Sequence, residues 1–165
     1  MAKKESASKN NEPKKLGDFG KWQSFVSQEN GKKVCYMISF PTSQEGNYKK
    51  RSKPYVMITH RPEDQSLDVI SIHAGYKFSK DKKPHILFKV GKQEKDYEMF
   101  VDEESAWAES DDIDQEITNL ITKSGTSFII KGESFKGTAT TDTYSLKGSL
   151  AAYHAINQAC RVHQP

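Results

Sequence analysis

The chain has 165 residues, which is enough for one well-filled hydrophobic core and too few for two ordinary domains. Its apolar fraction of 35% is low for a globular protein, so part of the chain is expected outside a packed core. Residues 1–15 carry five Lys and two acidic residues, whereas the remainder is neutral overall. A nucleic-acid-binding domain would carry its basic excess on the folded surface, so that class is excluded. No apolar run is long enough for a transmembrane segment.

The first residues are too polar to bury surface that would offset the entropy of ordering them. We therefore expect residues 1–16 to be a flexible N-terminal tail and residues 17–165 to form a single domain. A secretory signal needs a continuous apolar stretch, which this sequence lacks. Two interpretations remain at this point: a cytosolic protein, or a mature exported protein whose signal peptide has been removed.

Short segments rich in β-branched and aromatic residues recur between clusters of turn-forming residues, which is typical of an all-β domain. Several of them alternate between apolar and polar residues, as a half-buried strand does. The expected strands are residues 21–27, 33–40, 55–60, 68–76, 85–90, 97–101, 127–131 and 138–146.

Two later segments follow a helical pattern instead. Ser110 is a suitable N-cap for a helix whose first turn is acidic and whose apolar residues recur at helical spacing up to Ile121. A second, Ala-rich helix is expected after Gly148, with Ser149 as its cap. Together these elements predict a mainly β fold, a β-sandwich with two short helices.

The two cysteines, Cys35 and Cys160, are too few and too far apart for a structural zinc site. A disulfide between them would close a long loop in an oxidising compartment. Two buried free thiols are the alternative.

Motifs for catalysis or nucleotide binding are absent, and no cofactor, metal or catalytic residue is predicted. His60 and His73 lie on neighbouring expected strands and could meet across the sheet, although a metal site there would also need a carboxylate that the sequence does not place. The acidic run at residues 102–116 lacks the spacing of a calcium loop and is better explained as a solvated approach to a helix N-terminus.

Charge is distributed unevenly along the neutral part of the chain. Residues 16–100 carry fifteen basic and ten acidic groups, and residues 101–165 carry five and ten. Two basic clusters stand on expected loops; they are Lys49, Lys50, Arg51 and Lys53, and Lys77, Lys80, Lys82 and Lys83. They are either a contact surface for a protein or an anionic glycan, or solvated turns that keep the protein soluble.

Several blocks of the sequence resemble the bacterial invasion-associated locus B family. The blocks are residues 34–39 (VCYMIS), 54–62 (PYVMITHRP), 74–76 (AGY), 106–108 (AWA) and 137–146 (GTATTDTYSL), followed by Ala152, Tyr153, Ile156, Ala159 and Cys160. They span the chain from Trp22 to Cys160 and include no catalytic motif.

The resemblance implies an exported protein, made with a signal peptide and found in the periplasm, at the outer membrane or secreted, with an immunoglobulin-like β-sandwich. It also implies a link to bacterial entry into host cells, erythrocytes included, and no known cofactor. Export in turn favours a disulfide between Cys35 and Cys160. Trp22 and Trp107 are expected in the sandwich core.

Three functional hypotheses follow. The first is a non-enzymatic, exported invasion-associated protein that supports host-cell entry through contacts with a host-cell or bacterial envelope protein. The second is a periplasmic chaperone or envelope-stress factor that binds through an exposed sheet edge. The third is an envelope hydrolase whose site the sequence does not reveal.

Overall fold

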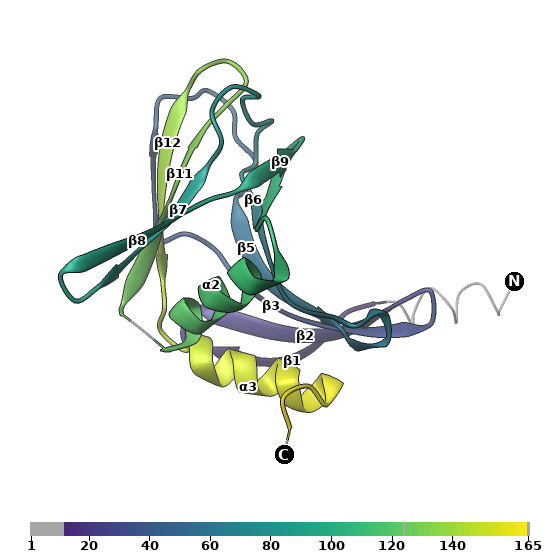
Figure 1. Ribbon diagram of the computed structural model, residues 1–165. Coiled ribbons are helices and arrows are strands. Elements are labelled where there is room, and N and C mark those ends of the chain that lie inside the picture. The colour runs from purple at the N-terminus through teal and green to yellow at the C-terminus, as the bar shows by residue number, and fades with distance from the viewer. Residues whose placement is uncertain (1–11, 124, 165) are drawn as a thin grey trace, which may run out of the picture.

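The computed structural model describes residues 12–123 and 125–164, which form two antiparallel sheets and two helices (Figure 1). The strands are β1 (Lys14–Phe19), β2 (Trp22–Glu29), β3 (Lys32–Ser39), β4 (Ser43–Gly46), β5 (Tyr55–Arg61), β6 (Ser66–His73), β7 (His85–Val90), β8 (Gln93–Glu98), β9 (Phe100–Asp102), β10 (Ser105–Trp107), β11 (Ser127–Glu133) and β12 (Ala139–Ser145). The helices are α2 (Asp111–Lys123) and α3 (Ser149–Cys160), with one 3-10 turn, η1 (Pro62–Asp64). The predicted mainly β fold with two helices is confirmed.

The chain passes repeatedly between the two sheets. The larger has seven strands in the order β1-β2-β3-β5-β6-β10-β9, and the smaller has five in the order β4-β12-β11-β7-β8. The segments from β4 to β5 and from β6 to β7 are therefore crossovers between sheets. Both predicted basic clusters lie in these crossovers, which places them at one end of the molecule (Figure 1).

Three strands, β1, β4 and β10, were not predicted, because each is short or polar. β1 begins at Lys14, so residues 14–16 of the expected tail belong to a strand, and Lys14 and Lys15 are paired with β2; residues 1–11 of that tail lie outside the described residues. β4 has no buried residue and is defined only by its pairing with β12. The single strand expected at residues 97–101 is two strands, β8 and β9, which belong to different sheets.

Both helices pack on the inner face of the larger sheet. Ser110 caps α2 as predicted, since its Oγ accepts the N–H of Ile113 at 3.2 Å. α3 lies against β1, β2 and β3, and its buried Ala152 allows a close approach in which Ser24 Oγ donates to the Ala152 carbonyl at 2.8 Å. No helix in the described residues is long and apolar enough to span a membrane.

The start of α3 differs from the prediction. Ser149 is the first helical residue and Gly148 precedes it with φ of 85°. A Cβ on Gly148 would lie 2.0 Å from the Phe19 carbonyl oxygen, so the chain needs glycine there for both its conformation and its close contact. The Ser149 hydroxyl instead donates to the Ile121 carbonyl at 2.7 Å and joins α3 to the end of α2.

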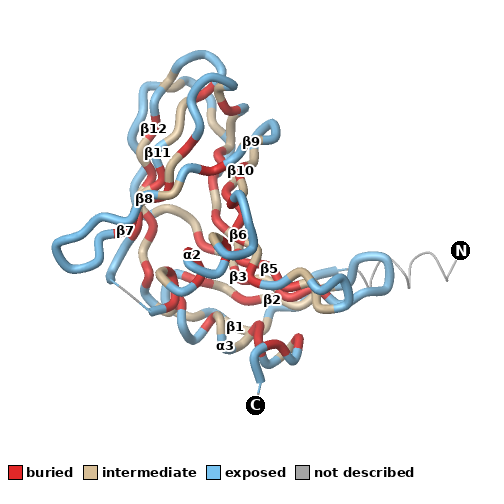
Figure 2. The backbone as a smooth tube through the Cα atoms, viewed as in Figure 1, coloured by how far each residue is buried: buried red, intermediate tan, exposed pale blue. Residues whose placement is uncertain are grey.

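One connected hydrophobic core contains residues from both sheets and both helices (Figure 2). Trp22 is fully buried in it, as expected, and its indole N–H donates to the Ser145 carbonyl on β12 at 3.0 Å. Trp107 is only half-buried and lies outside this core, so the expectation for that residue is wrong.

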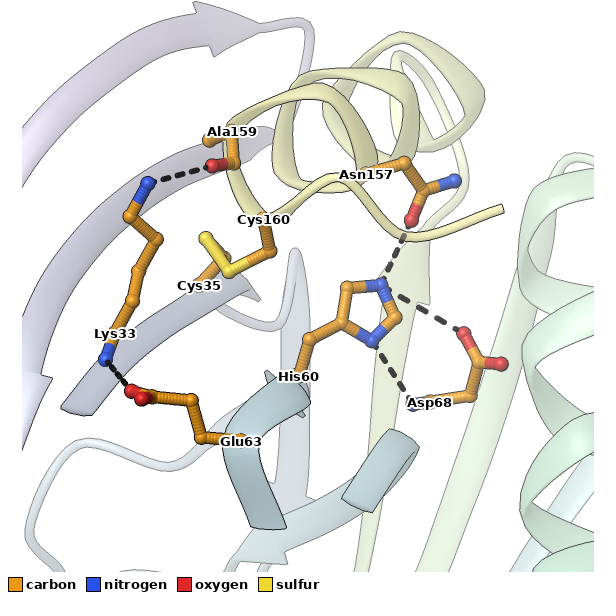
Figure 3. The surroundings of a disulfide bond; sticks show 8 residues. All are labelled: Lys33, Cys35, His60, Glu63, Asp68, Asn157, Ala159 and Cys160. Atoms are coloured by element: carbon orange, nitrogen blue, oxygen red, sulfur yellow. Dashed lines mark hydrogen bonds and ion pairs between the residues drawn. A yellow bond between two sulfur atoms is a disulfide. The ribbon is translucent and has the colours of Figure 1, made fainter. Parts of the chain in front are cut away.

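A disulfide joins Cys35 on β3 to Cys160 at the end of α3, across a Cα–Cα distance of 6.1 Å. It fastens the last helix to the centre of the larger sheet. Beside it, Lys33 Nζ donates to the carbonyl of Ala159 at 3.1 Å, which holds the same helix end from a neighbouring position on β3 (Figure 3).

We predict that replacing both cysteines, Cys35→Ala with Cys160→Ala, lowers the free energy of unfolding by about 5 kcal/mol, because the bond closes a loop across a sequence separation of 125 residues. Urea unfolding of the oxidised protein and the double variant measures the loss. Reduced wild-type protein is the control and should match the variant. Equal midpoints for all three proteins would contradict the prediction.

Candidate functional site

The loop between β4 and β5, residues 47–54, is fixed by Arg51. Its guanidinium forms a two-pronged ion pair with Asp142 on β12, in which Nη1 donates to Oδ1 at 2.8 Å and Nη2 donates to Oδ2. The Arg51 and Asp142 side chains are 2% and 5% exposed. Burial alone would lower the pKa of Arg51, but hydrogen bonds to Asp142 and Tyr48 raise it above its usual range, so Arg51 stays charged.

Two aromatic rings enclose the same guanidinium. Its carbon lies 5.1 Å from the ring centre of Tyr48 and 4.9 Å from that of Tyr76, both within range of a cation–π contact. Arg51 Nε also donates to the carbonyl of Ala74 at 2.7 Å. Each prong of the side chain therefore has a partner, and the two crossovers are joined through it.

The backbones of the two crossovers also meet directly. The N–H of Ser52 donates to the carbonyl of Gly75 at 3.0 Å. Gly75 has φ of 79°, and a Cβ there would lie 2.0 Å from the Ser52 carbonyl oxygen. Only glycine permits this approach, so the sequence block around residues 74–76 is explained by contact between the loops.

These contacts correct one part of the predicted basic cluster. Arg51 is not an exposed cation but the buried anchor of the loop. Lys49, Lys50 and Lys53 are exposed, and among residues 12–123 and 125–164 none of them has an acidic group within ion-pair distance. Lys53 Nζ instead lies 3.9 Å from the centre of the Phe40 ring. We call Lys49, Lys50 and Lys53 the loop lysines.

The second basic cluster is largely neutralised within the chain. Lys77 lies 3.5 Å from Glu103, Lys82 lies 3.5 Å from Glu133, and Lys83 lies 3.6 Å from both Glu98 and Glu109. Lys80 is the member with no ion pair in the part of the chain that the structure describes. Two residues of the acidic run, Glu103 and Glu109, therefore pair with these lysines.

Two hollows border this second cluster. One has a volume of about 560 Å³ and lies between the crossover at Lys80–Lys83 and the β11–β12 hairpin, with Lys131 and Glu133 on its wall. The other, of about 410 Å³, has an apolar floor of Phe78, Phe100 and Val101. Both are open and carry charges of both signs, which suits contact with a protein surface better than capture of a small anion.

A buried polar cluster lies beside the disulfide (Figure 3). His60 is fully buried on β5; its Nδ1 accepts the N–H of Asp68 at 3.0 Å and its Nε2 donates to Asn157 Oδ1 at 2.7 Å. The Asp68 carboxylate accepts Tyr153 Oη–H at 2.6 Å and His163 Nε2–H at 2.9 Å. His60 and His73, which could have met across the sheet, do not, because β5 and β6 pair Tyr55 with His73 and leave His60 at the other end of the hairpin.

The same cluster brings together three side chains of metal-ligand type. One ligand atom from each of His60, Asp68 and His163 lies within 4.8 Å of the other two. A metal on His60 Nε2 would require the ring proton on Nδ1, where the Asp68 N–H already donates. The residues therefore do not fit a metal ion. Burial lowers the pKa of His60, which favours the neutral ring that these two hydrogen bonds need.

One serine–histidine pair bears on the hydrolase hypothesis. Ser105 Oγ lies 3.0 Å from His73 Nδ1 on the outer face of the larger sheet. Among the described residues His73 has no carboxylate within ion-pair distance, and it stacks on Tyr55 at 4.3 Å between ring centres. The orienting acid of a catalytic triad is therefore lacking at this pair.

A second buried carboxylate supports the packing of α2 on the sheet. Asp114 is 7% exposed, and its Oδ1 accepts the N–H of Ile70 at 3.0 Å. Burial raises its pKa to about 6, and the neighbouring carboxylates of Asp111 and Asp68 add to the effect. The folded protein therefore binds this proton more tightly than the unfolded chain does.

We predict that Arg51→Ala destabilises the fold by roughly 3–5 kcal/mol, because it leaves the Asp142 carboxylate buried without a counter-charge. Urea unfolding measures the loss. Arg61→Ala is the control, since Arg61 pairs with Glu29 at the surface and its removal should cost less than about 1 kcal/mol. Equal losses for the two variants would contradict a structural role for the buried pair.

We predict that Asp114→Asn stabilises the protein above pH 6 and has little effect near pH 4. The pKa of Asp114 is higher in the folded protein than in the unfolded chain. The contribution of Asp114 to the free energy of unfolding therefore falls as pH rises from about 4 to about 6, by up to about 3 kcal/mol. Asparagine keeps an acceptor for the Ile70 N–H. Unfolding free energies at several pH values, with exposed Asp112→Asn as control, test this; a difference from wild type that does not change with pH would refute it.

Comparisons with known proteins identify the family and agree with the fold. The family model described as "Invasion associated locus B (IalB) protein" matches residues 22–157. The crystal structure of invasion associated protein b from Bartonella henselae is similar with a TM-score of 0.56 and 16% identity, covering 89% of this chain and 98% of that one. No curated protein sequence matches. Because the family model covers most of the chain and the fold agrees, the chain belongs to the invasion-associated locus B family.

Proposed function

We propose that this protein is exported and supports the entry of a bacterium into host cells, erythrocytes included, through protein contacts and without enzymatic activity. Membership of the invasion-associated locus B family is the observation that carries this role. The relative of known structure is itself named as an invasion-associated protein. The Ser105–His73 pair has no orienting carboxylate among the described residues, so it gives no support to the hydrolytic alternative.

The disulfide supports export. A bond between Cys35 and Cys160 forms and persists in an oxidising compartment, whereas a reducing cytosol keeps thiols free. We place the protein in the periplasm, at the outer membrane or outside the cell, after removal of a signal peptide.

The loop lysines are the surface that we assign to partner binding. They are exposed and have no acidic group within ion-pair distance among the described residues, whereas most of the second cluster has acidic partners there. The buried anchor Arg51 holds their loop in place before a partner arrives. Binding therefore loses little conformational freedom, and an acidic surface on a host-cell or bacterial envelope protein is the matching partner.

We predict that Lys49→Glu with Lys50→Glu slows association with that partner by about tenfold at low salt, because steering by charge acts mainly on the association rate. The control is Lys89→Glu with Lys92→Glu, which changes the net charge by the same amount. Lys89 is exposed near the end of β7, and Lys92 is exposed in the turn between β7 and β8. Binding of the purified proteins to host membrane and envelope extracts, with and without added salt, measures the effect.

A deletion strain complemented with each variant tests the role itself. Normal host-cell entry by the deletion strain would contradict the proposed function. If the deletion strain fails to enter host cells and the Lys49 and Lys50 variant restores entry fully, the proposed function stands. The assignment of the loop lysines to partner binding is then contradicted.

A further inference from the structure

The outer face of the larger sheet carries a band of apolar side chains, with polar ones such as Gln23, Ser71 and Ser105 among them, although both helices pack on its other side. Three pairs of stacked rings cross this face; they are Phe25 with Tyr36, Tyr55 with His73, and Phe100 with Trp107. Ile38 and Met57, which are paired across β3 and β5, lie between them. We call this surface the outer aromatic face.

The strand registers place these residues in continuous rows. In one row Phe25 lies opposite Tyr36. In another, neighbouring strands place Met57, Ser71, Trp107 and Phe100 opposite one another in that order. Directly opposite residues share a face of the sheet, whereas their neighbours along the strands, such as Ile58 and Ile72, are buried in the core. All eight members are half-buried or exposed, and none belongs to the core or to the residues packed against it.

The rings lean on each other in a way that limits what they can bind. Their centres are 5.2, 4.3 and 5.7 Å apart, with interplanar angles of 19°, 17° and 29°. A ring that is stacked on a neighbour uses one of its two faces within the protein, which reduces the open ring surface. Flat stacking of a sugar on an open ring is therefore disfavoured, whereas interdigitation with other side chains fits.

The outer aromatic face also carries almost no charge. His73 is its one ionisable group near neutral pH, and burial lowers the pKa of this imidazole, so the neutral form is favoured. Charges stand at the borders of the face and include both signs: Lys15 pairs with Asp18 at 3.0 Å on β1, Lys53 caps the Phe40 ring, and exposed Asp102 ends β9. A partner surface should be uncharged at its centre with a mixed rim.

The size of the face can be compared with known interfaces. Six strands spaced about 4.8 Å apart and three rows about 6.8 Å apart cover roughly 500 Å². That is near the upper limit for an apolar patch on a monomer. Two such faces together would bury about 1,000 Å², which is the lower bound for a specific protein–protein interface.

We propose that the outer aromatic face is the surface through which two copies of this chain associate. A second copy supplies an uncharged apolar centre and a rim of both signs, because it is the same surface. Two sheets packing face to face in this way resemble the two layers of a sandwich. This inference does not rest on Lys49 and Lys50, whereas Lys53, the third loop lysine, stands at the border of the face.

The two tryptophans of the chain provide the test. Trp22 is fully buried, so quenching by acrylamide reports on Trp107 in the outer aromatic face. We expect the wild-type protein to sediment as a dimer at high concentration and to dissociate on dilution across roughly 1–200 μM, as fits an interface near the lower size limit. Quenching of Trp107 should rise over the same range as the dimer dissociates.

Met57→Glu introduces a charge at the centre of the face and should give a folded monomer with high quenching at every concentration. Ile129→Glu is the matched control, because Ile129 is half-buried on the outer side of the smaller sheet; it should leave the dimer intact. A wild-type monomer with concentration-independent quenching would overturn the proposal, even if the face then bound a host protein or a lipid vesicle. So would a dimer that only Ile129→Glu disrupts. The wild-type dilution decides the question if Met57→Glu does not fold.

Discussion

The buried carboxylate of Asp142 sets the arrangement at one end of the molecule. A carboxylate that is almost fully enclosed needs a cation with matching geometry, and Arg51 supplies it from a loop 91 residues earlier in the chain. Because the Arg51 side chain also reaches the Ala74 carbonyl and two tyrosine rings, one ion pair positions both crossovers between the sheets. The orientation of the exposed lysines on these loops depends on it.

Ion pairs between distant segments, including Arg51 with Asp142, account for the uneven charge along the sequence. Arg51, Lys77, Lys82 and Lys83 belong to the basic first part of the chain, and their partners Asp142, Glu103, Glu133 and Glu109 belong to the acidic last part. The imbalance is thus largely a complementarity between segments that fold against each other. The charge that stays unpaired within the described residues, and could attract an external partner, is therefore smaller than the composition suggests.

Local patterns predicted the elements that have strong local causes. Seven strands, the Ser110 cap and the amphipathic α2 follow from alternation, turn residues and helical spacing. β4 and β10 escaped prediction because they are three or four residues long and depend on pairing partners distant in sequence. Loop positions of the lysines were predictable, but the burial of Arg51 was not, since nothing near it in the sequence indicates Asp142. Trp107 was misplaced for a related reason: alternation gives two faces of a strand without saying which one meets the core.

The disulfide has a consequence for the order of events in folding. Cys35 belongs to an early strand and Cys160 to the last helix, so the bond cannot form until nearly all of the described fold has been synthesised. Two cysteines permit a single intramolecular pairing, which leaves no wrong isomer to be reshuffled. A chain that crosses a membrane before it meets an oxidant would therefore cross in its reduced, less stable form. The disulfide would then form in a single oxidation step in the oxidising compartment.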